Sequence, residues 1–130
     1  MPADRFDHLF IAPRSFDAAL AFYRDGLGWV VAQQWASADG RGALLDGGGV
    51  KVVLAEGHAP GDGLPSGADR ATGPTLHLRV DDLDARFAAI GGAVRVNVPP
   101  GATHWGTRWF VVADPDGNRI AFEQTLDDAS

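Results

Sequence analysis

The feature that most constrains the fold is an order of secondary-structure elements that occurs twice along the chain: one strand, one helix, then three strands. In the first copy, Ser15 is placed to cap a helix that runs to Arg24, and Gly26 follows its end. The strands of this copy are apolar runs between turn residues, and we predict them at residues 7–12, 29–35, 43–46 and 50–55.

The second copy repeats this order after residue 74. Asp81 or Asp82 is placed to cap its helix, which the pair Gly91-Gly92 ends. Its strands are predicted at residues 75–80, 93–98, 109–113 and 119–124. The last two strands are joined by the turn Asp114-Pro115-Asp116-Gly117-Asn118, in which proline presets φ and the Asx side chains bond their own backbone. The two copies share the order of their elements and not their amino-acid sequence. This repeat predicts two units of similar structure.

A single βαβββ unit is a half-covered sheet that cannot bury its apolar face alone. We therefore predict an α+β fold in which two βαβββ units form curved mixed sheets around a common cleft, the expected binding site. The chain is predicted to be a single domain, 1–130, with units at 5–56 and 75–125. Residues 57–74 are rich in Gly, Pro, Asp and Ala and lack apolar periodicity, which predicts a linker or lid.

Composition and charge exclude several classes of function. The net charge of −6 argues against a nucleic-acid binder, which needs a basic face. The absence of Cys excludes disulfides, a thiol nucleophile and a thiolate metal site. The first ten residues lack the basic start and apolar core of a signal peptide, and no apolar run approaches the roughly 18 residues of a membrane span. We expect a cytoplasmic protein with no membrane partner.

Four short sequence motifs, taken together, indicate a family resemblance. They are His8-Leu9-Phe10-Ile11, the run from Ala21 to Trp29 that contains FYRDGLGW, Leu78-Arg79-Val80-Asp81, and the DPDGN turn at residues 114–118. Together they resemble the vicinal oxygen chelate superfamily, which includes glyoxalase I, fosfomycin-resistance enzymes, ring-cleaving dioxygenases and bleomycin-resistance binding proteins. The resemblance implies a homodimer, because family members commonly pair or swap units to complete the cleft.

The resemblance also implies where a metal would bind. Metal-dependent members carry a His or similar ligand on the first strand of each unit and a Glu on the last strand of each. His8 matches the first of these positions. The other three positions fall on residues that do not supply the ligand, namely Val53, Thr75 and Ala121.

A second candidate metal site uses residues two positions further along the strands. His77 would share a face with Thr75, and Glu123 would share a face with Ala121. With His8 they would form an open site of two His and one carboxylate for a divalent ion. However, His8 would remain at the original level while His77 and Glu123 lie two residues further on. Two residues along a strand span about 6.6 Å, whereas a metal–ligand bond is about 2.1 Å. We therefore predict no metal, with this set as the alternative. The other interpretation is that His77 and Glu123 hydrogen-bond each other.

Aromatic residues point to a different function. Large flat side chains occur near predicted strand ends and turns, and they are Phe10, Trp35, Trp105, Trp109 and Phe110. The N–H group of Trp suits half-wet pockets. Trp109 and Phe110 are sequence neighbours on a strand, so only one of them can line the cleft. Arg108 could donate to a ligand carbonyl or stack on a ring. Residues 105–108 resemble the WG-x-R piece of bleomycin-resistance-type members, which sequester drugs without metal or chemistry.

We therefore predict a small-molecule binding protein of the bleomycin-resistance type, which sequesters a flat aromatic natural product or antibiotic. Its candidate ligand-binding residues are His8, Phe10, Trp35, Val53, Thr75, His77, Trp105, Arg108, Trp109, Phe110, Ala121 and Glu123. The alternative is a metal-dependent lyase, isomerase or dioxygenase that uses His8, His77 and Glu123. A third hypothesis is metal-free acid–base catalysis by the His77–Glu123 pair, in which the carboxylate raises imidazole basicity.

Overall fold

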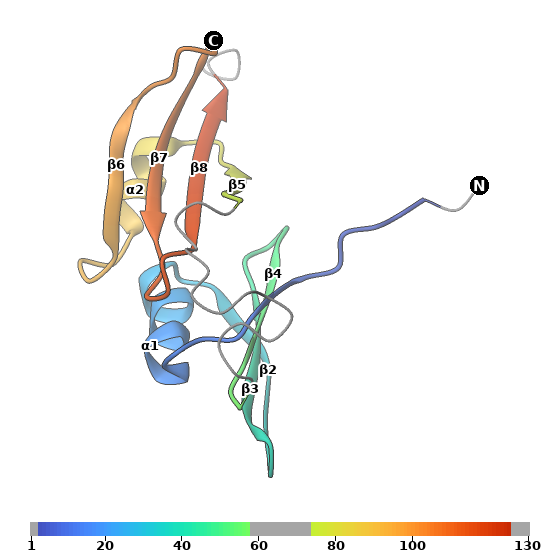
Figure 1. Ribbon diagram of the computed structural model, residues 1–130. Helices are drawn as coiled ribbons and strands as arrows, with labels where there is room; N and C mark the ends of the chain where they lie inside the picture. Colours follow the sequence, from blue (N-terminus) through green and yellow to red (C-terminus); the bar gives the residue numbers. More distant parts are fainter. Residues whose placement is uncertain (1–2, 58–73, 126–130) are drawn as a thin grey trace. The chain divides into compact units, whose positions relative to one another are not determined.

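The computed structural model describes residues 3–57 and 74–125 (Figure 1). The chain divides into two compact units, Met1–Ala68 and Asp69–Ser130. The interior of the predicted linker, residues 58–73, lies outside the described residues. No helix within the two described ranges is long and apolar enough to span a bilayer.

The first unit has the predicted order of strand, helix and three strands. Its sheet is ordered β1-β4-β3-β2, with β1 parallel to β4 and the other pairs antiparallel. Its elements are β1 (Leu9–Ile11), α1 (Phe16–Ala21), η1 (Phe22–Gly26), β2 (Val30–Ser37), β3 (Gly40–Asp46) and β4 (Lys51–Ala55). Ser15 caps α1 as predicted, since its hydroxyl accepts a hydrogen bond from Ala18 N at 3.2 Å.

The helix of the first unit ends differently from the prediction. We predicted an α-helix to Arg24, but α1 ends at Ala21 and continues as the wider π-helical turn η1. Leu27 N donates to Phe22 O at 2.8 Å, a bond of the five-residue spacing that defines such a turn. Both Phe22 and Tyr23 are buried. In the wider turn the angle between two successive side chains is smaller than in a regular α-helix, so both rings can face the core.

The two faces of the first sheet differ in burial. Alternate residues of β3 and β4 are inaccessible and form the core, namely Ala43, Leu45, Val52 and Leu54. The residues between them share the other face, where Phe10 pairs with Val53 and remains half exposed. Because side chains alternate across a strand, the first sheet has one closed face and one open face.

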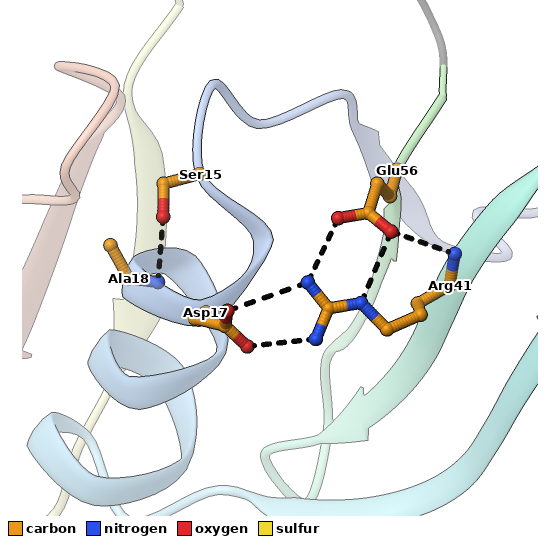
Figure 2. A network of polar contacts seen from close by, with 5 residues as sticks. All are labelled: Ser15, Asp17, Ala18, Arg41 and Glu56. Atoms are coloured by element: carbon orange, nitrogen blue, oxygen red, sulfur yellow. Dashed lines mark hydrogen bonds and ion pairs between the residues drawn. The ribbon is translucent and has the colours of Figure 1, made fainter.

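Arg41 ties β3 to the end of β4 and to α1 (Figure 2). Its Nε and Nη2 atoms donate to Glu56 at 3.1 and 2.9 Å, while Nη1 donates to Asp17 at 3.0 Å. The guanidinium also lies 4.8 Å from the centre of the Phe16 ring. Hydrogen bonds from Arg41 lower the pKa of Glu56 to about 2. Glu56 is therefore used within the first unit, as a carboxylate paired with an arginine.

The second unit repeats the architecture. Its sheet is ordered β5-β8-β7-β6, with β5 parallel to β8 and the other pairs antiparallel. Its elements are β5 (Leu76–Arg79), α2 (Leu83–Ala89), β6 (Arg95–Ala102), β7 (Thr107–Ala113) and β8 (Arg119–Thr125). Strand β6 extends beyond the predicted end at residue 98 through Pro99 and Pro100. An edge strand tolerates these prolines because their missing N–H groups are not needed by a second neighbour.

The helix α2 is fixed on the second sheet at its beginning. Asp82 caps it by accepting a hydrogen bond from Ala85 N at 3.0 Å, as predicted. The side chain of Gln124 on β8 accepts a second hydrogen bond from Leu83 N at 2.8 Å. Two of the free N–H groups of the helix start are thereby satisfied. Figure 1 shows α2 beside the second sheet, and the sheet face toward it is the closed one.

Aromatic stacking forms the core between α2 and the second sheet. The Phe110 and Phe122 rings stack at 4.8 Å, and the Phe87 ring of α2 meets Phe110 edge-on at 5.1 Å. Phe110 is fully buried. Each unit thus has the βαβββ order and a four-stranded mixed sheet, which confirms the predicted α+β fold class.

Candidate ligand-binding site

The candidate site lies on the open face of the second sheet. Trp109 on β7 lies opposite Glu123 on β8, and both alternate with the phenylalanines that face α2. On this side the structure contains an open hollow of about 340 Å³. It is lined by His77, Leu78, Arg79, Trp105, Thr107, Glu123 and Thr125. The site is thus built within one unit, from the strands β5, β8 and β7 and the connection before β7.

Glu123 is the centre of the polar contacts in this hollow. The Thr107 hydroxyl and Trp105 Nε1 both donate to its Oε2 atom at 2.6 Å, and His77 Nδ1 lies 3.1 Å from Oε1. The hydrogen bond from Thr107, followed by those from Trp105 and His77, holds the pKa of Glu123 below its usual value, although burial acts in the opposite direction. Glu123 is therefore an ionised carboxylate at neutral pH, and its hydrogen bonds fix three side chains around it.

A short β-hairpin connection places Trp105. Thr103 N donates to Thr107 O at 2.8 Å, and Thr107 N donates back to the Thr103 hydroxyl at 3.0 Å. Gly106 has φ of 90°, a value that L side chains rarely adopt. These contacts close the turn so that the indole of Trp105 lies over the hollow and reaches Glu123.

Aromatic rings form the walls of the site. The His77 ring is stacked over Trp109 with centroids 6.0 Å apart and planes 28° apart. The Trp105 ring meets Trp109 edge-on, at 5.2 Å and 82°. Trp105 remains 48% exposed, so a large apolar surface stands open to a ligand. An arrangement of this kind can accept a flat molecule against its rings and orient it with polar atoms.

The other interpretation of His77 and Glu123, a hydrogen bond between them, is confirmed. The two residues do not lie opposite each other on the parallel strands β5 and β8. His77 lies opposite Ala121, and Arg79 lies opposite Glu123. The contact between His77 and Glu123 is therefore diagonal, and it forms because both side chains are long enough to cross one residue pair.

Arg108 and Phe110 lie on the face of the second sheet that α2 covers. Phe110 belongs to the core described above. Arg108 makes two hydrogen bonds to Asp84 at the beginning of α2, at 3.2 and 3.3 Å. Of the neighbours Trp109 and Phe110, the tryptophan is the one on the open face. Helix placement, which strand alternation does not specify, decided between them.

Four predicted residues belong to the first unit. His8 precedes β1, is exposed, and its Nδ1 contacts Asp7 at 2.6 Å. Phe10 and Val53 are paired on the open face of the first sheet, and Trp35 on β2 lies on the same face over Gly42. Their part in ligand binding stays a prediction.

Two further predicted residues belong to the second unit. Thr75 precedes β5 and is half buried, and Ala121 is fully buried opposite His77. The structure therefore brings together His77, Trp105, Trp109 and Glu123, with Ala121 beneath them.

Thr107 was not among the predicted ligand-binding residues. Its hydroxyl is one of the two closest donors to Glu123. The available signal was strand parity, because Thr107 lies two residues before Trp109 and must share its face. A threonine on the binding face next to a carboxylate is a candidate hydrogen-bond donor.

The alternative prediction was a site for a divalent metal ion. Within residues 3–57, and separately within residues 74–125, no three His, Cys, Asp or Glu side chains gather as a metal ion would require. In the second unit the two candidate ligands, His77 and Glu123, are engaged with each other, and Oε2 of Glu123 already accepts two hydrogen bonds. A metal ion at Glu123 would have to compete with these hydrogen bonds for the carboxylate oxygens.

The chain belongs to the Glyoxalase/Bleomycin resistance protein/Dioxygenase superfamily, whose family model matches residues 5–122. TnmS3, an antibiotic binding protein from Streptomyces sp. CB03234, is 27% identical, with a TM-score of 0.71 over 96% of this chain and 98% of its own. A glyoxalase/bleomycin resistance protein from the same organism is 31% identical, with a TM-score of 0.64 over 92% and 100%.

A glyoxalase/bleomycin resistance protein/dioxygenase from Alicyclobacillus acidocaldarius shares the fold. It is 21% identical, with a TM-score of 0.70 over 97% of this chain and 95% of its own. No curated protein matches the chain. The family and the fold are therefore established.

Proposed function

We propose that this protein binds and sequesters a small, flat, partly aromatic molecule, a natural product or an antibiotic, without chemical change. The observation that carries the proposal is the hollow of the second unit, where the rings of Trp105 and His77, both packed against Trp109, lie beside one ionised carboxylate. The likeness to TnmS3, an antibiotic binding protein, supports it. Small-molecule sites combine apolar walls with few fixed polar groups in this way.

The size of the hollow and the nature of its walls favour a ligand of this class. A volume of about 340 Å³ lies at the lower end of the range for small-molecule pockets, roughly 300–1,000 Å³. A ring that stacks on Trp105 or Trp109 gains about 0.5–1.5 kcal/mol beyond the burial of its area. Two such contacts would contribute roughly 1–3 kcal/mol to the binding free energy, in addition to the burial of apolar area.

The proposal is tested by titrating a panel of aromatic antibiotics while tryptophan fluorescence is recorded. At least one compound should quench or shift the emission at micromolar concentration. Trp105→Ala and Trp109→Ala should lower the affinity of the protein for that compound. Trp35→Ala in the first unit is the matched control. If no compound changes the emission, or if Trp35→Ala weakens binding as much as Trp109→Ala does, sequestration at this site is wrong.

The His77–Glu123 contact supports a second candidate function, metal-free acid–base catalysis. Glu123 orients the imidazole, which is the arrangement that a general base requires. Mass spectrometry of each bound compound after prolonged incubation separates the two functions. An unchanged compound supports sequestration, and a product that Glu123→Gln no longer forms supports catalysis.

A divalent metal held by His8, His77 and Glu123 is the remaining alternative. The proximity of His77 and Glu123 favours it, and the hydrogen bonds that already occupy Glu123 oppose it. Metal analysis of protein purified without a His tag discriminates: we expect no stoichiometric metal. A near-stoichiometric divalent ion that Glu123→Ala loses would replace sequestration with metal-dependent lyase, isomerase or dioxygenase chemistry.

The proposal extends to the setting of the protein. We propose a cytoplasmic homodimer in which sequestration gives drug resistance. Light scattering of the purified protein tests the dimer. Growth of cells that express it, compared with cells that express Trp109→Ala, in the presence of the bound antibiotic tests resistance.

A further inference from the structure

The hydrogen bond to Glu123 determines which nitrogen of His77 carries a proton. Glu123 is ionised at neutral pH, because its three donors lower its pKa, and an ionised carboxylate only accepts hydrogen bonds. Nδ1 of His77, 3.1 Å from Oε1, must therefore be the N–H donor. In a neutral imidazole the other nitrogen, Nε2, then has a lone pair and no proton.

Nε2 is the polar atom that this ring offers to a ligand. The His77 side chain is 46% exposed and lines the hollow, while its ring is held flat over Trp109. Within residues 74–125, no group of the second unit hydrogen-bonds Nε2. A flat molecule that stacks on the aromatic walls would cover this acceptor. A covered acceptor without a donor is costly, so the ligand has to bring one.

Glu123 itself is a less favourable contact for a ligand. Its Oε2 atom already accepts from Trp105 and Thr107, and Oε1 accepts from His77. A ligand cation would have to compete with donors that the protein holds in place. A ligand carbonyl would bring a second acceptor to Nε2 and leave both atoms without a proton.

We propose that the site selects aromatic ligands with a free ring hydroxyl, a phenol or an enol, whose O–H group donates to Nε2 of His77. This inference rests on the proposed binding function and names the chemical class of the ligand. Glu123 and His77 then form one chain of hydrogen bonds, carboxylate to imidazole to ligand hydroxyl, which strengthens each of its links.

The test uses three probes that differ in one group: naphthol, methoxynaphthalene and acetylnaphthalene, each substituted at the same ring position. Their dissociation constants are measured by calorimetry at about pH 8, where a free imidazole is neutral. Naphthol should bind roughly three- to tenfold more tightly than either of the others, which corresponds to one net hydrogen bond. Equal binding of naphthol and methoxynaphthalene, or preference for acetylnaphthalene, would overturn the inference.

The matched variant is His77→Phe, which keeps a flat ring over Trp109 and removes both nitrogens. In this variant the advantage of naphthol should disappear while methoxynaphthalene still binds. An advantage that persists in His77→Phe would also contradict the inference, since the hydroxyl would then be recognised elsewhere. If the probes bind without discrimination, aromatic sequestration stands and hydroxyl selection fails. If none of the three probes binds, both fail.

Discussion

The two units place a tryptophan at the same level of their sheets, but from opposite strands. In the first unit Trp35 on the edge strand β2 lies opposite Gly42 on β3. In the second unit Trp109 on β7 lies opposite Gly101 on the edge strand β6. A β-carbon at Gly42 would come within 2.1–2.3 Å of the Trp35 ring, so the glycine makes room for the indole. The same scaffold thus carries its large ring in two alternative ways.

The neighbours of the two tryptophans differ more than the tryptophans do. Gly42 pairs with Ala55 in the first unit, whereas Trp109 pairs with Glu123 in the second. One level away, the strand that begins each unit offers Phe10 in the first and His77 in the second. At these two levels the open face of the first sheet is therefore apolar, whereas that of the second combines aromatic walls with a polar centre. This difference is why we assign selective binding to the second unit.

The largest expected effect concerns the closed faces, where the units also differ. Phe110 in the second unit corresponds in register to Ala43 in the first, and both are inaccessible. Phe110→Ala should lower the free energy of unfolding by about 3–5 kcal/mol, because it removes a buried ring that stacks on Phe122 and meets Phe87 edge-on. Urea denaturation measures it. A loss below about 1 kcal/mol would mean that the second core does not depend on its aromatic stack.

The next effect concerns the open faces and ligand binding. Trp109→Ala should lower the affinity for the best ligand tenfold or more, since it removes the ring on which His77 is stacked. Trp35→Ala should change the affinity by less than about twofold. Calorimetric titration of both variants against one ligand makes the comparison. Equal losses would erase the functional difference between the two sheets.

A smaller effect separates the two glycines that face the tryptophans. Gly42→Ala should lower the free energy of unfolding by about 1 kcal/mol, because the half-exposed Trp35 ring has to move away. Gly101→Ala should change stability by less than about 0.5 kcal/mol, since the nearest atom to its β-carbon would be Pro99 O at 3.8 Å. Thermal unfolding gives the stability, and the Trp35 emission reports the displaced ring. Equal losses of stability at the two positions would contradict the account that only Gly42 makes room for an indole ring.

The smallest effect is a dependence on acid and salt. The pKa values of Glu56 and Glu123 both lie below 4.5 in the folded protein, so both carboxylates stabilise it above about pH 4.5 and lose this contribution as pH falls through the folded pKa. For Glu56 the loss extends to about pH 2.

Salt should distinguish the two carboxylates, because Glu56 faces an exposed arginine and Glu123 is bonded chiefly by uncharged donors. The stability lost in Glu56→Gln should shrink with added salt, and that lost in Glu123→Gln should not. Urea unfolding of both variants at pH 7 and pH 3, at low and high salt, measures this. An equal salt response would show that Glu123 depends on charge as Glu56 does.

Much of the fold could be predicted from the sequence because local signals agree with it. Ser15 and Asp82 cap helices where they were expected, and the DPDGN turn joins β7 to β8. The π-helical turn could not be predicted, because burial of two consecutive aromatics outweighs regular helix geometry there. The contact between His77 and Glu123 was one of two interpretations of these residues, whereas their register depends on strand pairing that a sequence does not specify.

The roles of Arg108, Trp109 and Phe110 show the limit for the candidate site. Alternation along β7 predicted that neighbours face opposite ways, and the structure agrees. Which side is open depends on where α2 packs, and that is set by its contacts with Phe110 and by the pairing of Arg108 with Asp84. Thr107 was missed because a threonine has no signature of its own until a carboxylate is placed beside it.

The most direct test of ligand binding in the second unit uses the indole N–H signals of isotope-labelled protein in NMR spectra. The chain has four tryptophans, Trp29, Trp35, Trp105 and Trp109, and single Trp→Phe variants assign their signals. Addition of a bound aromatic antibiotic should shift the signals of Trp105 and Trp109 and leave those of Trp29 and Trp35 in place. Shifts confined to Trp35, with Trp105 and Trp109 unchanged, would contradict the account.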